Sequence, residues 1–153
     1  MHTIAMITGA TSGIGKDTAL LLAKNGFRVI ITGRRDDLLK EVTESIGATD
    51  PDRVFPLCFD VRDRESVKKA FDTLPENWKR ISVLINNAGL ASGFEPIHEG
   101  DFADWDKMID TNIKGILNVT YFVSKIMVEN RSGHIVNVSS VGGKETYPNG
   151  NVY

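Results

Sequence analysis

Short apolar runs rich in β-branched residues alternate along the chain with stretches in which apolar residues recur at helical spacing. The apolar runs predict five buried strands, at Ile4 to Ile7, Val29 to Ile31, Val54 to Phe59, Ile81 to Ile85 and Ile135 to Val138. Strands that are apolar on both faces are typical of a sheet that is covered on both sides.

Helices are predicted in the intervals between these strands. The interval after the second strand has apolar residues at helical spacing and Gly47 as its stop: Leu38, Leu39, Val42 and Ile46. The interval after the third strand has a similar pattern, opened by Asp63 and closed by Pro75: Val67, Ala70, Phe71 and Leu74. A helix with Ile14, Leu21 and Leu22 on its apolar face follows the first strand, and a long helix spans Asp104 to Glu129.

The alternation of strands and helices predicts an α/β fold, a Rossmann-type doubly wound parallel sheet within one domain over residues 1–153. In such sheets ligands bind at the carboxyl ends of the strands. Two irregular stretches, Asn86 to Gly100 and Ser140 to Tyr153, are long for loops of a compact domain, so we expect them to be functional.

Composition excludes several classes of partner. The 18 basic and 20 acidic residues give a formal net charge of −2, which predicts neither nucleic acid nor a membrane surface as partner. The start lacks a secretion signal, and no apolar run is long enough to span a membrane, so a cytoplasmic location is expected. One cysteine, Cys58, can form neither a disulfide nor a thiolate metal site and is expected to be buried.

A glycine-rich segment, TGATSGIG from Thr8 to Gly15, lies directly between the first strand and a helix. Glycines in this context allow a sharp turn and let the backbone approach a pyrophosphate at the helix N-terminus. The segment therefore predicts a dinucleotide site, and its residues assigned to the cofactor are Gly9, Thr11, Ser12, Gly13, Ile14 and Gly15. A P-loop is excluded, because Ala10 stands where that motif needs glycine and Asp17 where it needs a hydroxyl.

Two arginines follow the second strand, where an NAD enzyme places an acidic residue for the ribose 2′-hydroxyl. Arg34 and Arg35 are suited instead to a 2′-phosphate, and Lys16 could add a third charge. The predicted cofactor is therefore NADP(H). The alternative is that one or both arginines only solvate the start of the next helix.

From here the motifs resemble those of the short-chain dehydrogenase/reductase family. TGATSGIG is similar to its glycine loop, the sequence FDV to its adenine-binding segment, and NNAG to the motif after its fourth strand. The resemblance implies that Asp60 and Val61 contact the adenine. It also implies that Asn86, with the backbone of Ala88 and Gly89, serves the ribose and the integrity of the sheet.

The same resemblance implies three catalytic residues. Asn112 lies on the sheet-facing side of the long helix, where the family uses an asparagine to bend the helix and hold a water; the alternative is a buried asparagine satisfied by backbone. Ser140 precedes Tyr153 at the family's spacing, whereas Ser139 does not. Tyr153 would act as general acid and base and Ser140 as the hydrogen-bond donor to the substrate oxygen.

The family places a lysine four positions after this tyrosine, at position 157, to lower the tyrosine pKa. The sequence stops at Tyr153, so we expect a fragment whose sheet is incomplete at its C-terminal end, with an open edge at Ile135 to Val138.

Within the family the chain most resembles NADP-dependent 3-hydroxy acid dehydrogenases, which implies a small-molecule substrate. A 3-oxoacyl or general carbonyl reductase and a non-catalytic NADP(H)-sensing module remain alternatives. Glu95 and His98 are expected to be plain surface residues. The resemblance also implies a homotetramer built by pairing the long helix, in which Tyr121, Phe122 and Met127 serve either the interface or the core.

Overall fold

Five parallel strands form one sheet in the computed structural model, which describes residues 3–48, 50–145 and 147–153. In spatial order the strands are β3 (Val54–Cys58), β2 (Arg28–Gly33), β1 (Ile4–Ile7), β4 (Ile81–Asn86) and β5 (His134–Asn137). The order of the strands reverses between β1 and β4, which is the topological switch point of a doubly wound sheet. The predicted fold class and all five predicted strands are confirmed, with bounds that shift by a few residues.

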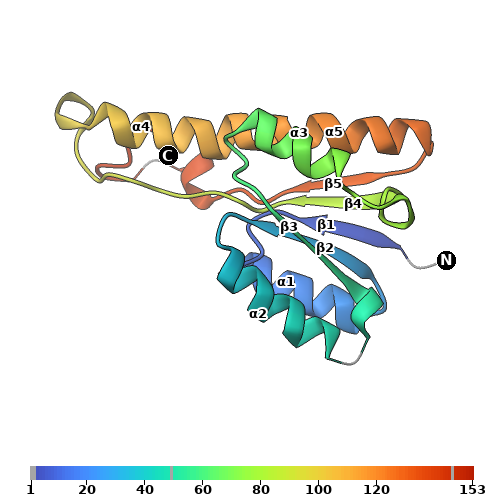
Figure 1. Cartoon of the computed structure of the whole chain (residues 1–153). Helices are drawn as coiled ribbons and strands as arrows, with labels where there is room; N and C mark the ends of the chain where they lie inside the picture. The colour runs from blue at the N-terminus through green and yellow to red at the C-terminus, as the bar shows by residue number, and fades with distance from the viewer. Residues whose placement is uncertain (1–2, 49, 146) are drawn as a thin grey trace.

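The helices cover both faces of this sheet (Figure 1). On one face lie α1 (Gly13–Lys24) and α2 (Asp36–Gly47), and on the other lie α3 (Arg64–Asp72), α4 (Phe102–Ile109) and α5 (Ile116–Glu129). Short 3-10 turns occur at Pro51–Arg53, Glu76–Trp78, Ile97–Glu99 and Val141–Gly143. Alternate residues of β1 supply the two cores: Met6 packs on the α3 and α5 side, and Ile7 on the α1 and α2 side.

The two helices predicted from their periodicity form as expected. Asp63 caps α3 by accepting hydrogen bonds from the backbone N–H groups of Glu65 (3.0 Å) and Ser66 (3.2 Å). In α2 the predicted apolar stripe is buried at Leu39, Val42 and Ile46.

The predicted apolar face of α1 is partly wrong. Leu22 packs against the core, but Ile14 and Leu21 are 67% and 62% exposed. The buried residues of α1 are Gly15 and Ala19, because small side chains allow this helix to approach the sheet closely.

The long predicted helix contains an irregularity. Between α4 and α5 the residues Asp110–Gly115 form a π-helical turn, hereafter the π segment, so the three pieces run end to end (Figure 1). A π turn holds one residue more than an α turn and often occurs at functional sites. Asn112 lies in this segment.

The two edge strands are β3 and β5. Pro56, which cannot donate a ladder hydrogen bond, is accommodated in β3 because this strand has a neighbour on one side only. All four residues of β5 are exposed, so the predicted open edge is present. Cys58 is also exposed, contrary to expectation, because alternation along β3 turns Leu57 into the core and Cys58 away from it.

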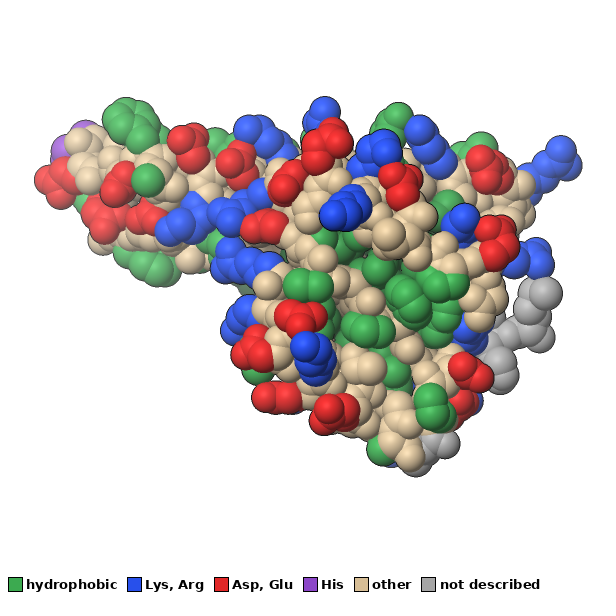
Figure 2. Space-filling model, viewed as in Figure 1, with side chains coloured by type: hydrophobic (Ala, Val, Ile, Leu, Met, Phe, Trp, Pro, Cys, Tyr) green, Lys and Arg blue, Asp and Glu red, His purple; other side chains and the backbone are tan. Residues whose placement is uncertain are grey.

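The surface carries both signs of charge. Figure 2 shows acidic and basic side chains interspersed over the helices on the face drawn. Within the part of the chain that the structure describes, none of the helices has the length and apolarity needed to cross a bilayer.

Candidate functional site

A cleft of about 820 Å³ opens at the carboxyl ends of the strands. Its wall is built from the segments that follow the strands, beginning with Gly9 after β1, Arg34 after β2 and Asp60 after β3, and ending with Ala88 after β4 and Ser140 after β5. Its size is typical of a site for a small molecule or cofactor, about 300–1,000 Å³. The cleft lies at the switch point, where the fold predicts it.

The glycine loop fits a bound anion. Gly9 has a φ of 67°, a left-handed conformation that favours glycine. A Cβ on Gly15 would collide with the carbonyl of Gly9, so α1 can begin against the loop only because Gly15 lacks a side chain. Ser12 precedes α1 without capping it, and the first turn contains no acidic residue. The helix N-terminus therefore offers N–H groups and a positive dipole end to a phosphate.

Asn87 holds the glycine loop to the end of β4. Its Nδ2 donates to the backbone carbonyls of Thr8 (2.9 Å) and Gly9 (3.3 Å). In return the Thr8 hydroxyl accepts from the backbone N–H groups of Asn87 and Ala88, both at 2.9 Å. Asn87 also lines the cleft, although no role was predicted for it from the sequence. Its place in the sequence NNAG, which follows the fourth predicted strand, was the available signal.

The two arginines after β2 both line the cleft but differ in their contacts. Arg35 donates from Nη2 to the hydroxyls of Thr11 (2.7 Å) and Ser12 (3.0 Å), so it braces the glycine loop. Arg34 is exposed, and among the described residues no hydrogen bond or ion pair engages its guanidinium. Arg34 is therefore available to an anionic ligand. Lys16, the suggested third cation, is not part of the cleft wall as the structure describes it.

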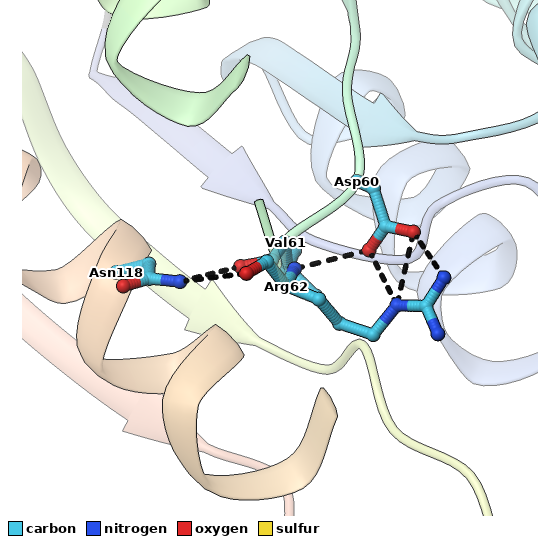
Figure 3. Close-up of polar contacts among 4 residues, drawn as sticks. All are labelled: Asp60, Val61, Arg62 and Asn118. Atoms are coloured by element: carbon cyan, nitrogen blue, oxygen red, sulfur yellow. Dashed lines mark hydrogen bonds and ion pairs between the residues drawn. The ribbon is translucent and has the colours of Figure 1, made fainter. Parts of the chain in front are cut away.

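Asp60 follows the edge strand β3 and therefore marks one end of the cleft, hereafter the far end. It pairs with Arg62 (Figure 3). The Arg62 Nη2 is 2.6 Å from Asp60 Oδ2, and Nε lies 3.1 Å and 3.0 Å from the two carboxylate oxygens. These hydrogen bonds hold the pKa of Asp60 below its ordinary value, and partial burial opposes them. The carboxylate therefore stays ionised and fixed in orientation.

Asn112 lines the cleft and is held by the loop after β4. Its Oδ1 accepts from the backbone N–H of Leu90 (2.9 Å), and its Nδ2 donates to the Leu90 carbonyl (2.8 Å). Backbone thus satisfies the amide, which was the alternative considered for this residue. The pair also ties the π segment to the start of the loop after β4.

Ser140 and Tyr153 both line the cleft, as does Ser139. The Ser140 Oγ accepts from the backbone N–H of Gly142 at 3.2 Å, and a Cβ on Gly142 would lie 3.3 Å from Cδ1 of Tyr153. Gly142 therefore lies between the two. Tyr153 is 40% exposed, so its phenol can reach a ligand.

The segment before Tyr153 is fastened to the loop after β4. Asn151 donates from Nδ2 to the backbone carbonyl of Glu95 at 2.7 Å. This bond joins the two irregular stretches that were expected to be functional. Glu95 and His98 themselves are exposed and lie outside the cleft wall, as expected.

The chain matches the family model described as short chain dehydrogenase over residues 3–153. It belongs to the short-chain dehydrogenase family. The motifs that carried the resemblance are therefore family motifs, and the segments that contain them meet at one cleft.

Named relatives and solved structures resemble the chain closely. The NADP-dependent 3-hydroxy acid dehydrogenase of Shigella flexneri is 42% identical over 98% of this chain and 59% of the relative. Sulfoacetaldehyde reductase 2 of Chromohalobacter salexigens is 45% identical over 100% of this chain and 60% of the relative. The closed form of a serine dehydrogenase complexed with NADP⁺ matches with a TM-score of 0.94 and 41% identity, over 99% of this chain and 59% of that one. The chain thus spans about three fifths of the length of these relatives.

Most of the residues that the family resemblance marked line the cleft, and three do not: Gly13, Gly15 and Asn86. Gly15 acts by letting the start of α1 lie against the carbonyl of Gly9. Asn86 is 2% exposed, and its Nδ2 donates to Thr120 Oγ1 (3.0 Å) and Asn137 Oδ1 (2.9 Å). These bonds join β4 to α5 and to β5. In this member of the family Asn86 therefore serves the sheet, whereas Asn87 lines the cleft.

Proposed function

We propose that the cleft binds NADP(H). The availability of Arg34 at the end of β2 is the observation that carries this proposal, because a guanidinium here suits a 2′-phosphate and disfavours NAD specificity. The N-terminus of α1 and the closely approaching backbone of the glycine loop fit the pyrophosphate. The names of relatives that depend on NADP or bind NADP⁺ support the same cofactor.

The proposed reaction is the interconversion of an alcohol and its carbonyl. The bound dinucleotide supplies the hydride chemistry. Tyr153 gives a proton to the carbonyl oxygen during reduction and takes it back during oxidation, and Ser140 donates a hydrogen bond that polarises the same oxygen. Asn112 fixes the loop after β4 against the π segment through Leu90.

The proposed substrate is a short 3-hydroxy acid or the corresponding semialdehyde. The name of the Shigella relative supports this class. The sulfoacetaldehyde reductase supports a related candidate, because sulfoacetaldehyde also carries an anionic group separated from its aldehyde by one carbon. In both classes one carbon lies between the acid group and the carbonyl that is reduced.

The test is NADPH consumption by the full-length protein with a panel of semialdehydes, sulfoacetaldehyde, 3-oxoacyl thioesters and uncharged aldehydes. We expect turnover with the acidic aldehydes and little with the others. Preferred turnover of the thioesters would make the protein a 3-oxoacyl reductase. Tight binding of NADPH without turnover of any member would contradict the dehydrogenase proposal and favour a sensing module.

We also propose that the protein works in the cytoplasm as a homotetramer paired along the long helix. An exposed apolar stripe supports the pairing, and it consists of Ile113, Leu117, Tyr121 and Val128. Two of the residues named from sequence belong to the core instead: Phe122 stacks on Phe71 with ring centroids 5.3 Å apart, and Met127 is 7% exposed. We expect a Leu117→Lys variant to sediment as smaller particles than the wild type.

A further inference from the structure

Asn118 of α5 is a buried amide that faces the turn after β3 rather than the cleft (Figure 3). Its Nδ2 donates to the backbone carbonyl of Val61 at 2.9 Å and lies 3.5 Å from that of Arg62. Its Oδ1 accepts from Nε of Arg64 at 3.2 Å. The amide therefore joins α5 to the turn after β3, at Val61 and Arg62, and to Arg64, the first residue of α3.

That turn shapes the far end of the cleft. The backbone carbonyl of Asp60 accepts from the N–H of Asp63 at 3.1 Å, and the Asp60 carboxylate accepts from the N–H of Arg62 at 3.0 Å. The carbonyls of Val61 and Arg62 take no part in these bonds, and Asn118 meets both. Since Asp60 and Val61 line the cleft, Asn118 fixes this wall from behind.

A second contact fixes the same wall by packing. A Cβ on Gly115, three residues before Asn118, would lie 2.7 Å from Cγ2 and 3.1 Å from Cβ of Val61. The missing side chain at Gly115 therefore leaves the space that the Val61 side chain fills. The hydrogen bond from Asn118 and the packing at Gly115 both act on Val61, and both come from the same long helix. Two contacts with one residue argue against an incidental arrangement.

We infer that Asn118 and Gly115 are positioning residues for the adenine end of the cleft. Neither touches the cleft, so they act through Val61 and Asp60, whose position they set. The inference rests on the proposed function, because it requires that a dinucleotide lies in the cleft. Disturbing either residue is expected to weaken binding of the adenine half and to spare the nicotinamide half.

The experiment compares two fragments of the cofactor. Adenosine 2′,5′-bisphosphate probes the adenine end, and reduced nicotinamide mononucleotide probes the other. Asn118→Ala and Gly115→Ala are expected to weaken binding of the bisphosphate about tenfold, the effect of one lost hydrogen bond or one displaced contact. Binding of the mononucleotide should change less than about twofold, within the spread of neutral surface changes.

Kinetics provide a second measurement. Both variants should raise the KM for NADPH while kcat at saturating NADPH stays near the wild-type value, which a general loss of structure would not do. The matched control is Asn130→Ala, an exposed asparagine at the C-terminus of the same helix, which should change neither fragment's affinity. Gly115→Ala also replaces glycine with a better helix former, which by itself would stabilise the helix. A loss of bisphosphate affinity in this variant is therefore not explained by a weaker helix.

The decisive quantity is the ratio of the two fragment affinities. An unchanged ratio in both variants contradicts the inference, whether the two affinities keep their wild-type values or fall by the same factor. A wild-type protein that binds no adenosine 2′,5′-bisphosphate contradicts the proposed cofactor instead, so the two failures are distinguishable.

Discussion

Gly15 at the start of α1 and Asn87 after β4 approach each other so closely that a Cβ on Gly15 would collide with the Asn87 amide. That amide is already engaged, because it donates to the carbonyls of Thr8 and Gly9. The beginning of α1, the glycine loop and the end of β4 are therefore packed as one unit. The position of the loop depends on the absence of one side chain.

Gly15→Ala should consequently displace the loop. We expect NADPH affinity to fall by at least about tenfold and the free energy of unfolding by about 1–3 kcal/mol, the usual cost of overpacking. Fluorescence titration and chemical denaturation measure the two effects. Gly47→Ala is the control, because a Cβ there would meet Val54 at an ordinary 3.7 Å. Wild-type affinity in Gly15→Ala would show that the loop is not set by this contact.

Arg34→Asp should reverse the cofactor preference. Loss of a charge-assisted contact to a 2′-phosphate costs about 1.5–3 kcal/mol, so NADPH affinity should fall roughly 10- to 100-fold while NADH affinity holds or rises. Arg35→Ala is the comparison: Arg35 bonds to the hydroxyls of Thr11 and Ser12, so both cofactors should bind less well. An unchanged NADPH to NADH ratio in Arg34→Asp would refute the NADP(H) assignment.

Tyr153→Phe and Ser140→Ala should each lower kcat by about 10²–10⁴-fold and leave NADPH affinity nearly intact, since both act on the reacting oxygen. Ser139→Ala, a neighbouring serine on the same cleft wall, should retain most of the activity. Steady-state kinetics with a substrate identified from the panel measure these values. Equal losses in the two serine variants would mean that the family spacing does not identify the catalytic serine.

Arg62→Met should change how the free energy of unfolding depends on pH. Hydrogen bonds from Arg62 lower the pKa of Asp60 in the folded state, so the pair stabilises the fold above the ordinary aspartate pKa of about 3.9. This contribution is lost as the pH falls through the lowered pKa. The wild type should therefore lose more unfolding free energy than the variant between pH 5 and pH 2. The difference should be below about 1 kcal/mol, because the side chains of Asp60 and Arg62 are 27% and 36% exposed.

Carbon-detected titration of the Asp60 carboxyl checks the cause directly. Its pKa should rise in Arg62→Met and stay unchanged in Lys68→Met, which removes a lysine paired with Asp72 on α3. A Lys68→Met variant that shifted the Asp60 titration equally would point to general charge effects rather than to the Arg62 hydrogen bonds.

Local sequence signals predicted much of this molecule. Apolar runs located the strands, and Asp63 marked the start of α3 because a cap bonds to residues two and three positions away. Exposure was harder to predict: Cys58 and Leu21 are apolar or weakly polar, yet neighbouring elements leave them uncovered.

The partners of the site residues were beyond the reach of sequence reasoning. Asn112 was expected to need a polar partner, but nothing in the pattern indicated Leu90, and nothing joined Asn118 to Val61 across the fold. Such pairs depend on how loops meet helices in space. The family resemblance implied a bend at Asn112, but the apolar periodicity did not indicate that the bend is a π turn.

The π segment sets the rotation of α5 relative to α4. If the same six residues, Asp110–Gly115, formed plain α-helix instead, the extra residue of the wide turn would rotate everything that follows by about 100°, the turn per residue of an α-helix. Asn118 would then point away from Val61 while Asn112 kept its place near Leu90. One continuous helix can therefore serve both ends of the cleft only because one of its turns is wide.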